Sequence, residues 1–176
     1  MDKKKSKQQD VLVIGAGASG MMTAITAARR GLSVTVLEHM DKPGKKILAT
    51  GNGKCNFTNL KMSPRCYYGD HGLVQEILKQ FTVEDTLAFF REIGIWPKEK
   101  NGYVYPNSGQ ASSVADALSA EMKRSGVSLS LPVTSGSFVR QNTDLRYGHP
   151  WERIVPTILF LQQVFVLHRN PEAMDP

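Results

Sequence analysis

A glycine-rich hexapeptide near the start of the chain has the residue types and spacing of a phosphate-binding turn. It follows the apolar run Val11–Ile14 and consists of Gly15, Ala16, Gly17, Ala18, Ser19 and Gly20. Glycine at its first, third and sixth positions permits a tight turn, a close approach of the backbone to a pyrophosphate, and close packing of a helix on a strand. A helix that begins here would offer N–H donors and partial positive charge to phosphates. The chemistry expected of this turn is binding of a dinucleotide.

A glutamate at the end of the next apolar run could bind the sugar of the same dinucleotide. Glu38 directly follows the run Ser33–Leu37. A carboxylate at this place accepts hydrogen bonds from ribose hydroxyls and repels a 2′-phosphate. The sequence therefore favours FAD or NAD over NADP at this turn. The adjacent His39 either borders the adenosine pocket or is an exposed loop residue, and the sequence leaves both readings open.

The elements that must position these residues form a β-α-β unit. Strands are predicted over 11–14 and 33–37, with a helix over 18–30 that stops at Gly31, where a left-handed residue commonly ends a helix. The first strand has the apolar pattern of a strand buried on both faces of a parallel sheet. We expect an α/β fold with an incomplete, Rossmann-like β-α-β unit and a parallel sheet, followed by helices and an irregular C-terminal tail.

A second stretch that could carry chemistry runs from Asp41 to Asn59. It is rich in glycine, lysine and asparagine and has little periodicity, so we expect a loop that ligands can approach. Its lysines and amides could neutralise a pyrophosphate or hydrogen-bond the polar edge of a flavin, while its glycines keep side chains out of the way. A basic, solvated loop without a ligand is the alternative.

Together, the hexapeptide and the stretch Gly44–Asn59 resemble the bacterial flavoproteins described as the aminoacetone oxidase-like, or NAD(P)/FAD-dependent oxidoreductase, family. The resemblance runs from about Val11 to Val133 and includes Tyr105-Pro106. It implies a two-dinucleotide-binding-domain FAD fold, FAD as the cofactor, and a small-molecule substrate with NAD(P)H or dioxygen as the redox partner. It also implies that the FAD lies along Lys45, Lys46, Thr50, Gly51, Gly53 and Asn56. No catalytic acid or base is identifiable.

The remaining elements are expected to complete the first part of this domain. Apolar residues at helical spacing predict amphipathic helices over 73–81 and 83–93 whose apolar stripes belong to the core. A strand at 103–105 should follow a tight turn. A capping box of Ser113 and Asp116 should open a helix that runs to about Arg124, and a strand should follow over 127–133.

Cysteines and histidines offer no metal or dithiol chemistry. Cys55 and Cys66 cannot make a disulfide framework, and without a recognisable leader the chain is expected in the cytoplasm. Cys55 is expected near the cofactor, and Cys66 in a buried packing role. The four histidines show no metal-ligand spacing.

The charge and hydropathy of the chain exclude two further classes. The net charge is +6, but the positive residues are spread along the sequence without a nucleic-acid-binding motif, so no nucleic-acid partner is predicted. The longest strongly apolar stretch, Ile154–Leu167, is interrupted by Pro156 and is shorter than the roughly 20 residues that span a bilayer. No membrane partner is predicted.

The domain organisation expected from the sequence has three parts. Residues 1–10 form a basic N-terminus, residues 11–133 the N-terminal portion of an FAD/NAD(P)-binding domain, and residues 134–176 a tail without a clear period. In the resembled family the chain continues with an Ala-Thr-Gly-Gly strand end and a glycine-rich loop near the flavin. Read in a shifted frame, Pro156–Asp175 can encode similar strings, so we interpret the tail as the product of a frameshift between about Val127 and Trp151.

Three functional hypotheses follow. The chain is the FAD-binding part of an oxidoreductase, a module that binds NAD or an adenine nucleotide without flavin, or a truncated remnant without function. An out-of-frame tail would have no reason to complete the sheet, and apolar faces of the β-α-β unit would then be exposed.

Overall fold

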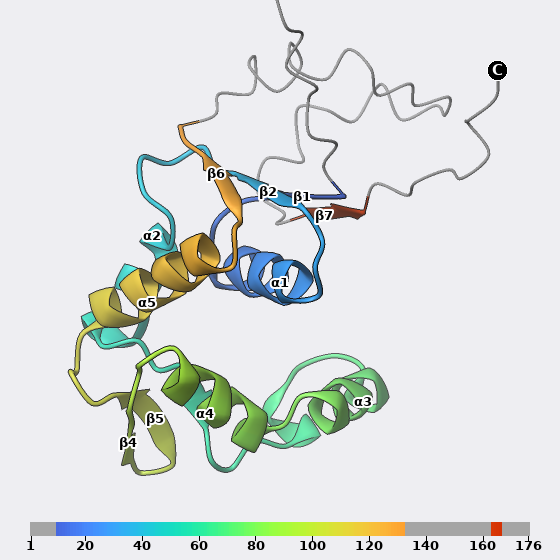
Figure 1. Ribbon diagram of the computed structural model, residues 1–176. Coiled ribbons are helices and arrows are strands. Elements are labelled where there is room, and N and C mark those ends of the chain that lie inside the picture. The colour runs from blue at the N-terminus through green and yellow to red at the C-terminus, as the bar shows by residue number, and fades with distance from the viewer. Residues whose placement is uncertain (1–9, 133–162, 167–176) are drawn as a thin grey trace, which may run out of the picture. The chain divides into compact units, whose positions relative to one another are not determined.

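The computed structural model describes residues 10–132 and 163–166, and it divides the chain into two compact units (Figure 1). The first unit comprises Met1–Pro43 and Met122–Pro176, and the second comprises Gly44–Glu121. The fold is α/β, with a parallel sheet in the first unit, as predicted.

The sheet of the first unit has the strand order β6-β2-β1-β7. Its parallel strands are β1 (Val11–Ile14), β2 (Val34–Leu37) and β6 (Ser128–Ser130). Strand β7 (Gln163–Val166) lies within the unassigned tail and pairs antiparallel with β1. The β-α-β order expected from the sequence is confirmed, and the β1 edge of the sheet is occupied by a strand that the sequence did not predict.

Helix α1 (Ala18–Arg29) packs against β1 and β2 and buries one face of the sheet. Val11, Val13, Val34 and Val36 are buried, whereas the alternate side chains of both strands are half-buried. The prediction that the first strand is buried on both faces is therefore wrong, because the pleat turns every second side chain away from α1. Gly31 has a φ of +85° just after the helix and confirms the predicted stop.

The second unit contains short elements around a three-stranded antiparallel sheet of order β3-β5-β4. Its strands and helices, with two 3₁₀ turns at Thr50–Gly53 and Pro64–Cys66, are α2 (Lys45–Leu48), β3 (Thr58–Asn59), α3 (His71–Gln80), α4 (Val83–Glu92), β4 (Pro97–Lys100), β5 (Tyr103–Pro106) and α5 (Ala111–Arg124), whose last residues are counted with the first unit. The predicted strand at 103–105 is confirmed. It follows a turn in which Asn101 and Gly102 have φ values of 55° and 87°, as a tight hairpin requires.

In the second unit the predicted core position is confirmed for Phe90 of α4 and is wrong for three residues of the α3 region. Phe90 of α4 is buried and stacks on Phe57 with ring centroids 4.4 Å apart. In contrast, Leu73, Ile77 and Phe81 of the α3 region are exposed. Helical spacing identifies an apolar stripe but not what covers it, so the stripe alone could not distinguish the two helices.

The predicted capping box at Ser113 is also wrong, because α5 already begins at Ala111. Inside the helix the Ser113 hydroxyl donates to the carbonyl of Gln110 at 2.8 Å. The capping box found in this unit is at α4, where Thr82 caps the helix and exchanges hydrogen bonds with Asp85. Both sites have a hydroxyl residue three positions before an aspartate, so the pattern could not decide between them.

The last strand of the first described range is shorter than predicted. The strand expected over 127–133 is present only at 128–130, whereas Val127, Leu131 and Pro132 lie outside it. Val133 lies outside the described residues, as does most of the predicted tail. Across residues 10–132 and 163–166, no helix is long and apolar enough to cross a bilayer.

Candidate functional site

The glycine-rich hexapeptide forms the turn between β1 and α1 in the first unit. Gly15 has a φ of +93° and donates its N–H to the carbonyl of Leu37 at 2.7 Å. Gly17 is the N-cap of α1 and provides no side chain to cap the first helical amides. Ala16 is buried, whereas Ala18 and Ser19 are exposed at the start of the helix. The turn therefore presents backbone at a helix N-terminus, the arrangement in which phosphates bind.

Gly20 is required by a close approach of helix and turn. A Cβ atom at this residue would lie 1.9 Å from the carbonyl oxygen of Gly15 and 3.4 Å from Cγ1 of Val13. A contact of 1.9 Å cannot be relieved by a side-chain rotation, because the atom it meets belongs to the backbone. The role inferred from the sequence, close packing of helix on strand, agrees with this geometry.

Glu38 is buried at the carboxyl end of β2, with 6% of its surface exposed. Its Oε2 accepts the N–H of Ala16 at 2.6 Å, and its Oε1 accepts the N–H of Met40 at 2.8 Å. The backbone N–H of Glu38 donates to Ser130 of β6 at 3.0 Å, which fixes the residue to the sheet. The structure thus joins Glu38 directly to the glycine-rich turn, as the predicted ribose contact requires.

His39 adds a third polar group to this carboxylate. Its Nδ1 lies 2.9 Å from Oε1 of Glu38, while 61% of the His39 side chain is exposed. Because a carboxylate oxygen can only accept a hydrogen bond, Nδ1 is the ring nitrogen of His39 that carries the proton. A carboxylate has about four lone-pair positions, so this set still leaves Glu38 the capacity to accept a ribose hydroxyl.

The second predicted stretch lies in the second unit and is not the irregular loop that was expected. Lys45 and Lys46 are exposed on the short helix α2, whose N-cap Gly44 has a φ of 71°. The Thr50 hydroxyl donates to the carbonyl of Ile47 at 2.6 Å. Helical spacing was missed here because one turn of helix contains too few apolar residues to show a period.

A run of left-handed residues follows α2. Gly51 and Asn52 have φ values of 54° and 53°, and Gly53 and Cys55 have 78° and 56°. A Cβ at Gly51 would lie 2.9 Å from the backbone nitrogen of Asn56 and 3.5 Å from Cε1 of Tyr105. Thr50, Gly51, Gly53 and Asn56 are exposed, and at its two glycines this turn presents backbone without a side chain.

One of the two cysteines, Cys66, lies in a different environment from the one predicted. Cys55 is buried within the turn, and desolvation by burial raises the pKa of its thiol. Cys66 was predicted to be buried and is exposed, with its Sγ 3.5 Å from the Ser63 hydroxyl, a contact that lowers the pKa of the Cys66 thiol. Within residues 10–132 and 163–166, no group of three or more potential metal ligands gathers.

Comparison with known protein families identifies the family of this chain. Residues 9–148 match the model of the HI0933-like protein Rossmann domain. The chain belongs to the HI0933-like family. It carries the FAD-binding Rossmann domain of these flavoprotein oxidoreductases, and FAD is its cofactor, as predicted. The resemblance to the aminoacetone oxidase-like group in particular is not tested by this match.

Curated relatives of this HI0933-like chain include two kinds of enzyme. The chain is 47% identical over 120 residues to the 3-dehydro-bile acid delta(4,6)-reductase of Clostridium scindens, covering 66% of this chain and 29% of the relative. It is 35% identical over 128 residues to the ribosomal RNA dihydrouridine synthase of Haemophilus influenzae, covering 72% and 32%. The Escherichia coli enzyme of the same name is 33% identical over 124 residues, covering 69% and 31%.

The chain therefore spans about a third of the length of the curated relatives that it matches. The family match reaches residue 148, and the domain boundaries and the frameshift interpretation of the tail remain predictions. The exclusion of a nucleic-acid partner also remains a prediction, since two of these relatives are named for ribosomal RNA.

Proposed function

We propose that the chain is the FAD-binding part of a flavin-dependent reductase, with the ADP half of FAD held by the hexapeptide Gly15–Gly20 and by Glu38. The observation that carries this proposal is the hydrogen bond from the N–H of Ala16 to the Glu38 carboxylate, which sets a buried carboxylate beside the N-terminus of α1. The amides of the turn would bind the pyrophosphate, and Glu38 would accept a ribose hydroxyl.

The residues present fit this part of the cofactor. A side chain at Gly20 would collide with Gly15, so the narrow turn depends on glycine there. The carboxylate of Glu38 would repel a 2′-phosphate, which favours the unphosphorylated ribose of FAD over NADP. The buried carboxylate is held in place by hydrogen bonds from two backbone amides and by its contact with His39.

We assign the flavin half to the second stretch, through Lys45, Lys46, Thr50, Gly51, Gly53 and Asn56. Support comes from the family resemblance, from the exposure of both lysines, and from the left-handed turn in which Gly51 and Gly53 are exposed. Lysine charges and backbone amides suit the pyrophosphate and the polar edge of an isoalloxazine.

The reaction proposed for the whole enzyme is reduction of a carbon–carbon double bond in an unsaturated ring. The names of two relatives, a delta(4,6)-reductase and a dihydrouridine synthase, both describe such a reduction. When bound, FAD would supply hydride-transfer chemistry. The proposed electron donor is a nicotinamide of the NAD(P)H class, since a reductase needs a source of two electrons. An oxidase of the aminoacetone oxidase-like kind would instead pass electrons from its substrate to dioxygen.

Neither cysteine of the described chain forms a disulfide, which supports the proposed cytoplasmic location.

A calorimetric titration of the purified full-length chain with FAD and, separately, with NAD tests this proposal. We expect FAD to bind at micromolar or lower concentration and NAD to bind at least tenfold more weakly, because NAD lacks the flavin that the second stretch is proposed to bind. Equal affinities for FAD and NAD would favour the simple NAD-binding module. Absence of binding to either ligand would favour the non-functional remnant.

The frameshift interpretation has a separate test in the coding DNA. If a neighbouring frame encodes the Ala-Thr-Gly and Gly-Ser-Asn-Gly strings and continues for a few hundred codons, the residues after about 130 are not family sequence. If no such frame exists, the tail is genuine and the interpretation is wrong.

A further inference from the structure

The two oxygens of the Glu38 carboxylate accept unequal numbers of hydrogen bonds. Oε1 accepts the N–H of Met40 at 2.8 Å and lies 2.9 Å from Nδ1 of His39. Oε2 accepts the N–H of Ala16 at 2.6 Å. Among residues 10–132 and 163–166, these three groups are the donors that contact the carboxylate. Oε1 therefore has two donors, whereas Oε2 has one.

A single acceptor position of Glu38 remains for a ligand. Each carboxylate oxygen offers two lone-pair positions, so both positions of Oε1 are filled and one position of Oε2 is free. The Glu38 side chain is 7% exposed. Rotating its carboxylate to offer a different position would break the bonds from Ala16 and Met40. The free position on Oε2 is thus the one that a bound nucleotide can use.

A ribose has two neighbouring hydroxyls, and each needs its own acceptor position. A carboxylate with a free position on each oxygen can accept both hydroxyls, one on each oxygen. Glu38 has no free position on Oε1, because Met40 and His39 occupy that oxygen. The geometry therefore allows Glu38 to accept one ribose hydroxyl and leaves the other without this partner.

Only one of the three donors depends on the type of residue that supplies it. Ala16 and Met40 contribute backbone N–H groups, which every residue except proline possesses. His39 contributes its side chain, and 61% of that side chain is exposed. Whether Oε1 is full or half-free is therefore decided by the side chain at position 39.

We propose that His39 determines the sugar specificity of the nucleotide site: by filling Oε1, it limits Glu38 to one of the two ribose hydroxyls. This inference rests on the proposed function, in which Glu38 binds the adenosine ribose. The ligand class that follows is an adenine nucleotide in which one of the 2′- and 3′-hydroxyls is dispensable for binding. His39 acts through Glu38 and is a positioning residue.

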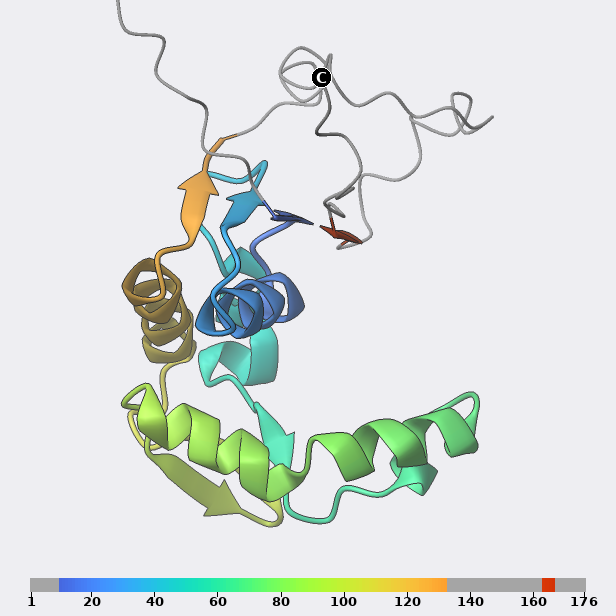
Figure 2. The ribbon, with the colours of Figure 1, turned by 45° about the vertical axis from the view of Figure 1, so that its right-hand side comes forward.

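The elements around Glu38 hold the carboxylate in place without His39. Figures 1 and 2 both show β2, which ends just before Glu38, between β6 and β1. The N–H of Glu38 donates to Ser130 of β6 at 3.0 Å, and the N–H of Gly15 donates to Leu37 at 2.7 Å. These backbone bonds do not involve the imidazole. Removal of the imidazole should therefore open one position on Oε1 without releasing the carboxylate.

Calorimetric titration of the full-length chain with ADP, 2′-deoxy-ADP and 3′-deoxy-ADP tests the proposal. With the unchanged chain, we expect one deoxy analogue to bind about tenfold or more weakly than ADP, and the other to bind within about twofold of ADP. With His39→Ala, both analogues should bind about fivefold or more weakly than ADP, because the second hydroxyl then has an acceptor.

A conservative variant separates the donor from the bulk of the imidazole. In His39→Asn the amide nitrogen is bonded to Cγ, as Nδ1 of histidine is, so it can donate to Oε1 of Glu38. This variant should restore the pattern of the unchanged chain. A purely structural role of His39 would weaken all three ligands equally and would leave the ratios between their affinities unchanged.

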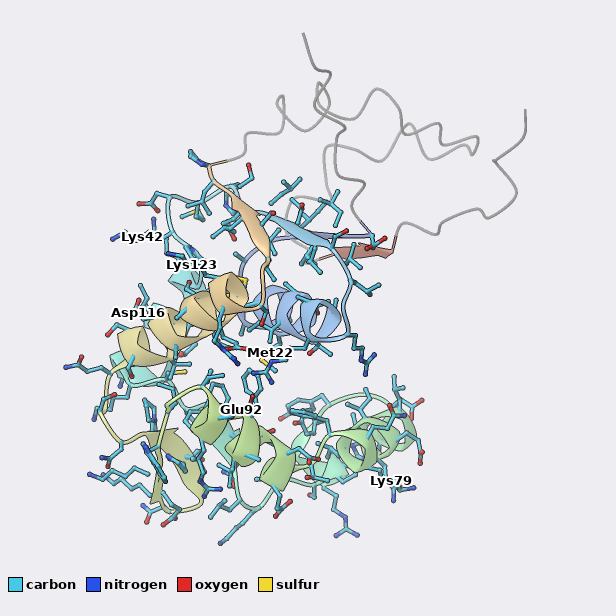
Figure 3. All side chains as sticks on the ribbon, viewed as in Figure 1. Met22, Lys42, Lys79, Glu92, Asp116 and Lys123 are labelled. Carbon is cyan, nitrogen blue, oxygen red and sulfur yellow. The ribbon has the colours of Figure 1, made fainter. Side chains whose placement is uncertain are left out.

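Matched controls come from two other exposed positions. His71→Ala removes an exposed histidine of the second unit, whose Nε2 lies 3.0 Å from the carbonyl oxygen of Tyr67. Lys123→Ala removes an exposed side chain of α5 from the part counted with the first unit (Figure 3). Both controls should keep the ligand pattern of the unchanged chain. Circular dichroism should show all variants folded, since every substituted side chain is exposed.

Three results would overturn this proposal and leave the proposed function standing: equal losses for both deoxy analogues in the unchanged chain, a His39→Ala variant with the unchanged pattern, or a His39→Asn variant that matches His39→Ala. The first would mean that His39 leaves Oε1 when a nucleotide binds. Equal affinities of the unchanged chain for ADP and both analogues, or no binding of ADP, would contradict the proposed function as well, since Glu38 would then bind no ribose hydroxyl.

Discussion

The turn at Gly15–Gly20 and the turn at Thr50–Asn56 both depend on glycine, but for different physical reasons. Gly20 has an ordinary helical backbone, and only the space at its Cβ is forbidden, by the carbonyl of Gly15 1.9 Å away. Gly51 has a φ of +54° and also a close approach, 2.9 Å to the nitrogen of Asn56. The first turn is a packing constraint between two regular elements, whereas the second combines a local backbone conformation with a close contact.

This difference explains which of the two regions could be predicted from the sequence. Strand, turn, helix and second strand each leave a pattern around Gly15, and Glu38 follows at the expected place. The contact between Glu38 and Ala16 agrees with that pattern. In the second region, one helical turn and a left-handed run leave no periodic signal, so residue types and the resemblance, not a pattern of elements, indicated its role.

The strongest expected effect concerns the packing constraint. Gly20→Ala should destabilise the chain by about 3 kcal/mol or more, because the new methyl group must displace the Gly15 backbone. Gly31→Ala is its control in the same unit: Gly31 has a φ of +85°, with nothing within 4 Å of its Cβ position, and should cost about 1 kcal/mol. Equal urea midpoints for the two variants would contradict the packing account.

The alkylation rates of the two thiols should show how rarely the Thr50–Asn56 turn opens. Cys66 is exposed and has a lowered pKa, whereas Cys55 is buried in the turn and has a raised pKa. We expect iodoacetamide at pH 7.5 to modify Cys66 more than tenfold faster than Cys55, measured by mass spectrometry of peptides, since the thiolate is the reactive form. Similar rates would mean that the turn opens readily and does not form a fixed site.

A substitution in the Thr50–Asn56 turn should weaken the binding of FAD but not of ADP, which would distinguish the two turns functionally. Gly51→Ala distorts only the stretch assigned to the flavin half, so FAD affinity should fall about tenfold while ADP affinity changes less than twofold. Gly109→Ala is the matched control, because Gly109 has a φ of +67° but nothing near its Cβ position. Loss of ADP affinity in Gly51→Ala would show that the two regions do not divide the cofactor as proposed.

The smallest effect concerns the helix start that the sequence misplaced. Hydrogen bonds from the Thr82 backbone and hydroxyl lower the pKa of Asp85, so the capping box stabilises α4 above about pH 4 and is lost as pH falls through the lowered pKa. Asp85→Asn should slightly flatten the acid side of the stability curve measured by circular dichroism. Glu84→Gln, a neighbour outside the box, should not.

Burial was the property least accessible from the sequence. The stripes of α3 and α4 both have helical spacing, yet α3 has no buried residue, whereas Phe90 of α4 is buried and contacts Phe57. Cys66 was expected to be buried beside two tyrosines and is exposed with them. Periodicity reports the direction of side chains along one element, and burial depends on a second element that periodicity does not identify.

The most direct test of the central claim is the affinity of Glu38→Gln for FAD and for ADP, with Glu76→Gln as the control. Glu76 is exposed and pairs with Lys79 at 2.8 Å, a contact that contributes little. If Glu38 holds the ribose of the cofactor, Glu38→Gln should bind both ligands at least tenfold more weakly, since a hydrogen bond to a charged group contributes about 1.5–3 kcal/mol. Unchanged affinity for both ligands in a folded Glu38→Gln variant would contradict the account.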